Sequence, residues 1–172
     1  MPDTRRRIRR ISKAEMNVFR RIRLEALRCE PDAFASIYED WLKFSNAEWR
    51  AEMNISIFVA FVDGEPAGLM GLRQLSPAKM MHRATLTMVY VGLSFRGSGL
   101  ARELLDAVIG YAESKGIAQV ELGVRADKER AVRFYQRAGF VAIGNVPDGY
   151  ADTGDVFDET LMVLRIKSGH SG

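Results

Sequence analysis

The apolar residues near the N-terminus of the chain change from strand-like to helical spacing. Ile8–Ile11 predicts a short strand, and Ser12 behind it is a residue type that caps helices. A second helical stretch, interrupted by Pro31, runs on to Trp49. The apolar positions that indicate the first helix are Met16, Phe19, Ile22, Leu24 and Leu27.

From Ile57 onward the spacing is typical of strands. Phe58–Val62 and Ala67–Leu75 flank the sequence Asp63-Gly64-Glu65-Pro66. Because Asp-Gly tolerates the positive backbone angles of a tight turn, these two segments predict an antiparallel hairpin. Ser76–Arg83 predicts a loop, and Ala84–Val91 predicts a further strand that leads directly into a glycine-containing turn.

The rest of the chain alternates helices and strands. The predicted helix after the glycine turn stops near Gly116, and Asp127 is the expected N-cap of the next helix, which Gly139 ends. Between and after these helices we predict strands at Ala118–Val124, Phe140–Ile143 and Leu161–Ile166. A polar loop is expected between the last two strands, and it contains Asp148, Asp152, Asp155 and Asp158. The order β-α-α-β-β-β-α-β-α-β-β predicts a mixed α/β fold in a single domain, residues 1–172.

Charge and composition narrow the class of protein. The net charge is +3, and Arg5, Arg6, Arg7, Arg9 and Arg10 form a cluster that is either a solvated arm or a phosphate-attracting segment. The arm lacks the aromatic residues or recognition helix that nucleic-acid binding usually needs. No apolar run approaches the roughly 20 residues of a spanning helix, so we expect neither export nor a membrane segment.

Cysteine and histidine usage gives two further expectations. Cys29 is the only cysteine, which fits a reducing compartment and predicts a cytoplasmic protein. Cys29 lies in a helical stretch, where we expect a small buried residue rather than a nucleophile. Two histidines without a Cys/His cluster predict that the protein has no metal site.

The turn between Ala84–Val91 and the following helix has the features of an anion site. The first N–H groups of a helix lack helical partners, and Gly97 and Gly99 leave that backbone uncovered. Arg96 and Arg102 add positive charge. A tight turn that happens to use glycine is the alternative, whereas a P-loop and a Rossmann fingerprint are excluded, the latter because Arg102 occupies its third glycine position.

Two segments of the chain resemble motifs of the GNAT superfamily of N-acetyltransferases. The segment from Val91 to Ala101 is similar to motif A, Q/R-x-x-G-x-G/A, with Arg96, Gly99 and Ala101 at its defining positions. The segment Ala131–Phe140 is similar to the motif B signature A-x-x-x-Y-x-x-x-G-F. The resemblance spans about residues 55–166 and implies an acyl-CoA N-acyltransferase fold, with a mixed, mostly antiparallel sheet and flanking helices.

The resemblance also implies a cofactor and a chemistry. Acetyl-CoA would lie with its pantetheine arm between two splayed strands and its pyrophosphate on the turn, while an amine attacks the thioester directly. An amide near Val89–Val91 would stabilise the oxyanion, and Tyr135 would protonate the departing thiolate. The implied cofactor-binding residues are Val89, Val91, Arg96, Gly97, Ser98, Gly99, Leu100, Ala101, Arg102, Lys128 and Tyr135.

The chain departs from the family pattern at two places. Lys128 stands where motif B usually has asparagine, and Ala84–Val91 lacks the glutamate that often serves as the base. The candidates left for the base are Glu39, Asp40, His82 and Asp158.

Three classes of function follow from these features. The first is an N-acetyltransferase for an unidentified amine. Members of the family that the chain resembles often dimerise, so a homodimer is one expected assembly. The second is a non-catalytic acyl-CoA sensor with the same fold, and the third is a nucleic-acid-binding protein that uses the arginine arm. We expect the first, with no nucleic acid or membrane as partner.

Overall fold

The computed structural model describes residues 4–167 as a seven-stranded sheet with helices along it. The hydrogen-bonded strand order is β1-β2-β3-β4-β5-β7-β6. This mixed sheet confirms the predicted fold class and the predicted order of strands along the chain. The chain divides into two compact units, one made of residues up to Arg73 with Leu86–Tyr111, the other of Gln74–Thr85 with the residues from Ala112 onward.

Strands β1 to β3 of the first unit form an antiparallel meander. They comprise Arg6–Ile11, Ser56–Val62 and Glu65–Gln74, and β4, Arg83–Val91, contributes its last six residues to the same unit. Between β2 and β3 the chain turns at Asp63 and Gly64, which have φ of 51° and 86°. The predicted hairpin is therefore confirmed, together with the turn residues that carry it.

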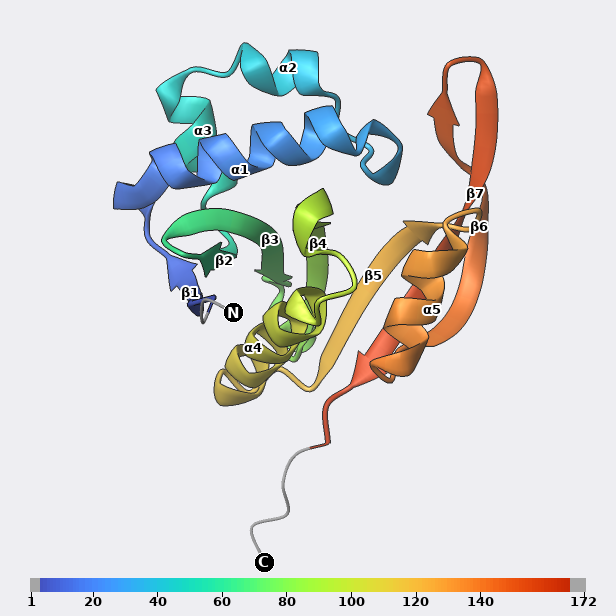
Figure 1. Cartoon of the computed structure of the whole chain (residues 1–172). Helices are drawn as coiled ribbons and strands as arrows, with labels where there is room; N and C mark the ends of the chain where they lie inside the picture. Colours follow the sequence, from blue (N-terminus) through green and yellow to red (C-terminus); the bar gives the residue numbers. More distant parts are fainter. Residues whose placement is uncertain (1–3, 168–172) are drawn as a thin grey trace, which may run out of the picture. The chain divides into compact units, whose positions relative to one another are not determined.

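Three helices cover these strands (Figure 1). They are α1, Met16–Cys29, α2, Tyr38–Leu42, and α3, Asn46–Glu52, so the second predicted helical stretch is two short helices. Phe19 of α1 packs edge-on against Trp41 and Trp49 at centroid distances of 6.3 and 5.5 Å. These rings share a core with buried residues of the strands, among them Ile57, Leu69, Met88 and Tyr90. Single 3₁₀ turns lie at Lys13–Glu15, Pro31–Ala33, Ala78–Met80 and Leu93–Phe95.

One charged side chain lies inside this core. Arg23 of α1 is only 3% exposed, and its guanidinium carbon lies 4.8 and 4.4 Å from the ring centroids of Phe34 and Trp41. Among the described residues, its Nε and Nη1 have no hydrogen-bond partner. Burial lowers the pKa of Arg23 to about 10, against the opposing effect of the charge on Glu52.

Helix α4, Leu100–Ser114, follows the glycine turn and buries Leu100, Leu104 and Leu105. Gly68 of β3 permits its approach, because a Cβ there would lie 3.4 Å from Leu104 and 3.1 Å from the Tyr90 carbonyl oxygen. Gly116, with φ of 73°, follows the helix and confirms the predicted end.

The second unit contains β5, Gln119–Arg125, α5, Glu129–Arg137, β6, Val141–Asp152, and β7, Asp155–Arg165. Strand β5 pairs in parallel with the first three residues of β4, where Arg83 forms a two-point ion pair with Glu121 at 2.7 and 2.9 Å. Strand β7 is antiparallel to both β5 and β6.

Two local predictions in this unit are wrong. The expected polar loop is instead a long β6–β7 hairpin, which turns at Thr153 and Gly154 with φ of 47° and 86°. Asp127 is not the N-cap of α5: Lys128 occupies that position, because both carboxylate oxygens of Asp127 accept hydrogen bonds from Arg125 at 2.9 and 2.8 Å. A carboxylate held by a guanidinium in this two-point geometry is not available to cap a helix.

Candidate functional site

The turn between β4 and α4 presents an open stretch of backbone. Gly97 and Gly99 have φ of 72° and 86°, and a Cβ built on either would meet no atom within 4 Å. The Glu103 N–H donates to the Gly99 carbonyl at 3.1 Å and begins the helical ladder, so the preceding amides of Leu100 and Ala101 have no helical acceptor. The turn therefore has the uncovered amides and the helix N-terminus that bind anions.

The arginines beside the turn are engaged with the protein itself. Arg96 forms an ion pair with Glu30 and donates from Nε to the Val91 carbonyl at 3.3 Å. Arg102 pairs with Asp106 one helical turn away at 2.9 Å. Two nitrogens of Arg96 thus bind groups of the protein, whereas the turn leaves the amides of Leu100 and Ala101 open.

The turn is also fixed from the side of β1. Arg6 donates to the Ser98 carbonyl from both terminal nitrogens, at 3.1 and 3.2 Å, and pairs with Glu103 at 2.5 Å. This guanidinium holds a carbonyl of the turn and the first turn of α4 together. One arginine of the N-terminal cluster thus has a structural role close to the predicted anion site.

The end of β4 departs from regular strand geometry at Met88, which has φ of 56°. Such a value is uncommon for a residue other than glycine and interrupts the extended backbone. The interruption lies directly before Val89–Val91, where we predict the oxyanion-stabilising amide. The side chains of Val89 and Val91 are half-buried, whereas Met88 and Tyr90 point into the core.

A buried phenol at this end of β4 contacts a carboxylate of α1. The Tyr90 hydroxyl donates to Glu25 Oε1 at 3.0 Å, and Tyr90 is 4% exposed. Burial, then the Glu25 carboxylate and the nearby Cys29 thiol, raise the pKa of Tyr90, so the phenol keeps its proton and remains a donor. Sequence reasoning missed this pair, because nothing in the local pattern of either segment marks the two residues as neighbours.

Tyr135, the predicted proton donor, lies on α5 of the second unit. It is 6% exposed and packs against Phe134 and Phe140 at centroid distances of 5.4 and 5.6 Å. Burial, with a smaller effect of Tyr150, raises the pKa of Tyr135. The phenol therefore holds its proton at neutral pH, which is the state that a proton donor requires.

The remaining predicted residues are more exposed. Lys128 precedes α5, and its backbone N–H donates to the Arg125 carbonyl at 3.0 Å. Of the four candidate bases, Glu39 and Asp40 are exposed on α2, His82 is exposed in a loop, and exposed Asp158 accepts from the Asp148 N–H at 3.1 Å. Cys29 is exposed, so the expectation that it is buried is wrong: it lies at the last residue of α1.

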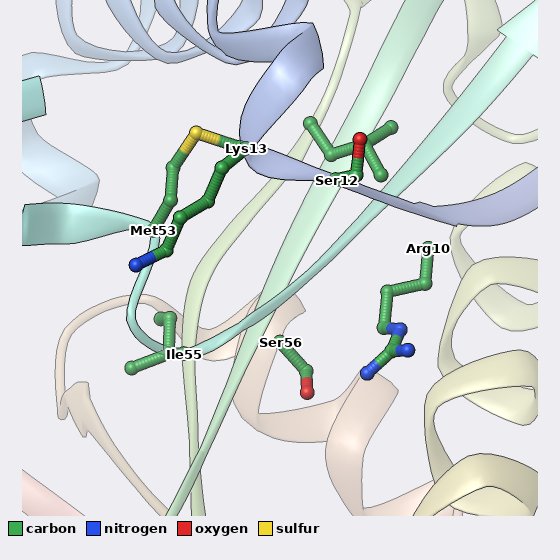
Figure 2. A pocket seen from close by; sticks show the side chains of 7 residues that line it. Arg10, Ser12, Lys13, Met53, Ile55 and Ser56 are labelled. Atoms are coloured by element: carbon green, nitrogen blue, oxygen red, sulfur yellow. The ribbon is translucent and has the colours of Figure 1, made fainter. Parts of the chain in front are cut away.

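Several arginines of the N-terminal cluster bind other groups of the same chain. Besides Arg6, Arg9 forms a two-point ion pair with Glu15 at 2.6 and 3.0 Å, and Arg10 donates to the Tyr111 hydroxyl at 2.7 Å. Arg10 and Lys13 line opposite sides of a hollow of about 270 Å³ between β1 and the start of β2 (Figure 2). Lys13 in turn donates to the Asn54 side chain.

Residues 19–140 match the Acetyltransferase (GNAT) family, so the chain belongs to this family. It is 27% identical over 141 residues to an uncharacterized N-acetyltransferase of Methanocaldococcus jannaschii, covering 77% of this chain and 59% of the relative. It is 31% identical over 87 residues to the [ribosomal protein bS18]-alanine N-acetyltransferase of Escherichia coli K12, covering 51% of this chain and 59% of the relative. The chain thus spans somewhat over half the length of these relatives.

The fold is shared with solved structures. A putative acetyltransferase from Salmonella typhimurium, solved with its cofactor acetyl-CoA, superposes with a TM-score of 0.77 at 20% identity, covering 98% of both chains. Within residues 4–167 no helix is both long and apolar enough to cross a membrane. The same residues contain no group of three or more side chains suited to hold a metal ion.

Proposed function

We propose that this protein is an N-acetyltransferase that transfers the acetyl group of acetyl-CoA to an amine by direct attack in a ternary complex. Membership of the GNAT family supports this reaction class. The observation that carries the proposal is the turn at residues 96–101, where two glycines with positive φ leave open space above the N-terminus of α4.

The residues of this turn fit a pyrophosphate. A side chain at Gly97 or Gly99 would occupy the space through which an anion reaches the amides, and the protein itself leaves that space empty. The backbone amides of Gly97, Gly99, Leu100 and Ala101 would bind the phosphate oxygens, whereas the Ser98 N–H donates to the Phe95 carbonyl at 3.4 Å. Arg96 and Arg102 would add charge at the rim, and Lys128 would meet a further phosphate.

Acetyl-CoA, when bound, supplies the acetyl thioester. An amide within Val89–Val91 donates to the carbonyl oxygen as negative charge develops on it, and the interrupted backbone at Met88 supports an exposed donor there. Tyr135 gives its proton to the departing thiolate, consistent with a phenol that stays protonated at neutral pH.

The proposal extends to the acceptor and to the assembly of the protein. The acceptor is a primary amine, a proposal supported by the relative that is named a [ribosomal protein bS18]-alanine N-acetyltransferase. We propose a cytoplasmic homodimer, supported by the single cysteine and by the apolar side chains that β6 exposes, Val141 at 64% and Ile143 at 65%. Light scattering of the purified protein tests the dimer, and a monomer at micromolar concentration would contradict it.

Binding of the cofactor is tested by thermal unfolding. Acetyl-CoA at one hundred times its Kd should stabilise the fold by about 2.7 kcal/mol, and NAD or ATP at the same concentration should not. Equal stabilisation by NAD would overturn the assignment of the site to CoA.

A further inference from the structure

The proposed reaction needs a base that the predicted set of residues does not supply. A primary amine is largely protonated at neutral pH, because its pKa is about 8 for a peptide α-amino group and about 10 for an alkyl amine. An ammonium ion has no lone pair with which to attack a thioester. The four candidates from the sequence, Glu39, Asp40, His82 and Asp158, are all exposed.

We propose that Glu25 is the general base that takes the proton from the acceptor ammonium, and that Tyr90 positions it. This inference rests on the proposed acetyl transfer. It comes from one contact between α1 and the end of β4, the hydrogen bond of 3.0 Å from the Tyr90 hydroxyl to Glu25 Oε1.

The location of Glu25 fits this role. The same Oε1 atom lies 3.8 Å from the point where a Cβ of Gly92 would stand, so the carboxylate reaches the backbone directly after Val91. Val89–Val91 is the segment that would hold the thioester carbonyl. A Cβ at Gly92 would also lie 3.3 Å from the Ala67 carbonyl oxygen and 3.4 Å from Phe95, so the backbone here has no room for a side chain beside the carboxylate. An amine approaching that carbonyl would lie within reach of Glu25.

Two polar contacts fix the C-terminal half of α1 in this position. Tyr90 binds Glu25, and Arg96 in the following turn binds Glu30, one residue beyond the helix end. Glu25 is half-buried, so its carboxylate is held by the protein while it still meets solvent. A base that must return its proton to water between turnovers needs both properties.

The surroundings of Glu25 include a phenol that keeps its proton, because the pKa of Tyr90 is raised. The titratable groups beside Glu25 are the Tyr90 phenol and the Cys29 thiol, which lies close to the same phenol. The turn after β4 contributes Arg96, which is paired with Glu30. The elements that contact α1 are α2, α3 and the 3₁₀ turns on either side of it, and their charged or titratable residues are Lys13, Glu15, Asp32, Tyr38, Glu39, Asp40, Glu48, Arg50 and Glu52. Because the pKa of Tyr90 is raised, the phenol donates to Glu25 rather than competing for the acceptor's proton.

The protons and bonds of the reaction balance with this assignment. Glu25 accepts one proton from the ammonium, and the freed lone pair forms the C–N bond as the C–S bond breaks. The nitrogen then loses its second proton to water, the thiolate gains one from Tyr135, and Tyr135 and Glu25 exchange protons with solvent to restore the starting state. The net products are the amide, free CoA and one proton.

The test is the pH dependence of acetyl transfer in the full chain. Acceptors are a peptide with N-terminal alanine, spermidine, and hydroxylamine, which is already neutral at pH 7. With the alkyl amine that wild type acetylates fastest, Glu25→Gln should lower kcat/KM by about 10²–10⁴-fold at pH 7. The loss should shrink as pH rises, because the rate of the variant then follows the neutral fraction of the amine. With hydroxylamine, Glu25→Gln should change the rate little.

Two further variants separate the roles. Tyr90→Phe keeps the carboxylate but removes one hydrogen bond to it, so kcat should fall by about tenfold and the acidic limb of the pH profile should move to higher pH. Glu113→Gln removes an exposed carboxylate of α4 and should leave both the rate and the profile unchanged. Melting temperature and CoA affinity, measured for every variant, check that the fold and the cofactor site are intact.

The outcomes distinguish this inference from the proposed function. A Glu25→Gln variant with wild-type rate and pH profile would overturn the base while acetyl transfer stands. Equal losses with hydroxylamine and with the alkyl amine would also overturn it, because a base is not needed for a neutral acceptor. Wild-type protein that acetylates none of the three acceptors would contradict both proposals.

Discussion

Replacing Gly99 by alanine separates the backbone strain of the glycine turn from its contact with a phosphate. Gly99 has φ of 86°, and a Cβ there would meet no atom of the protein within 4 Å. The substitution should therefore cost only the strain of an L-residue with positive φ, about 1–2 kcal/mol. For a chain of this length each kcal/mol lowers the Tm by roughly 2–4 °C.

Gly64 offers a matched control, because it has the same φ of 86° and the same open space but lies in the β2–β3 turn. Gly64→Ala should lower the Tm by a similar amount. Only Gly99→Ala should weaken CoA binding, since its methyl group would displace a phosphate oxygen from the amides. Loss of one charge-assisted hydrogen bond is worth about 1.5–3 kcal/mol, which corresponds to a rise in Kd of roughly 10- to 150-fold.

Isothermal titration with CoA at 25 °C measures the two Kd values, and thermal unfolding measures the two Tm shifts. The reasoning is refuted if Gly99→Ala binds CoA as tightly as Gly64→Ala does. Equal weakening in both variants would also refute it, because the effect would then come from general destabilisation of the fold.

Three other substitutions test separate parts of the account. Tyr135→Phe should lower the single-turnover rate of acetyl transfer by about 10²–10⁴-fold with little change in CoA affinity, and a surviving rate would exclude Tyr135 as the proton donor. Arg96→Ala should raise the Kd for CoA by less than Gly99→Ala does, since Arg96 is paired with Glu30 and the backbone amides remain. Arg23→Met should raise the free energy of unfolding by about 1–3 kcal/mol, because the folded state disfavours the charged guanidinium at every pH below its lowered pKa of about 10. The exposed control Arg28→Met should change the free energy of unfolding by less than about 0.5 kcal/mol. A lower Tm for Arg23→Met would contradict this account of the core.

Local sequence signals predicted those elements whose geometry is decided by neighbouring residues. Asp63-Gly64 predicted the β2–β3 hairpin, and Gly97 and Gly99, predicted to leave the backbone before α4 uncovered, both have positive φ. Gly116 and Gly139, both with positive φ, follow the helices that they were expected to end. In each case one or two residues determine a backbone angle that few other residue types adopt.

The predictions that were wrong depend on partners that are distant or that compete locally. Asp127 has the residue type of an N-cap, but Arg125 holds its carboxylate. The acidic residues between 144 and 158 suggested a loop, yet the Thr153-Gly154 turn pairs their backbone in the β6–β7 hairpin. Neither outcome can be derived from the charge or polarity of the segment alone.

The candidate site divides in the same way. The turn proposed to bind an anion is contiguous in sequence, so its residues could be proposed from spacing. Glu25 and Tyr90 are 65 positions apart and meet only because α1 packs on β4. A carboxylate on a helix that also carries many other charges gives no signal of this contact until the fold is known.

The central claim is tested most directly by release of free CoA thiol from acetyl-CoA in the presence of a primary amine, with the amine product identified by mass. The account predicts thiol release that requires both the protein and the amine, with one acetyl group found on the amine nitrogen. Tight binding of acetyl-CoA without acetylation of any amine across neutral to alkaline pH would contradict it, and would leave the protein as a binder of acyl-CoA.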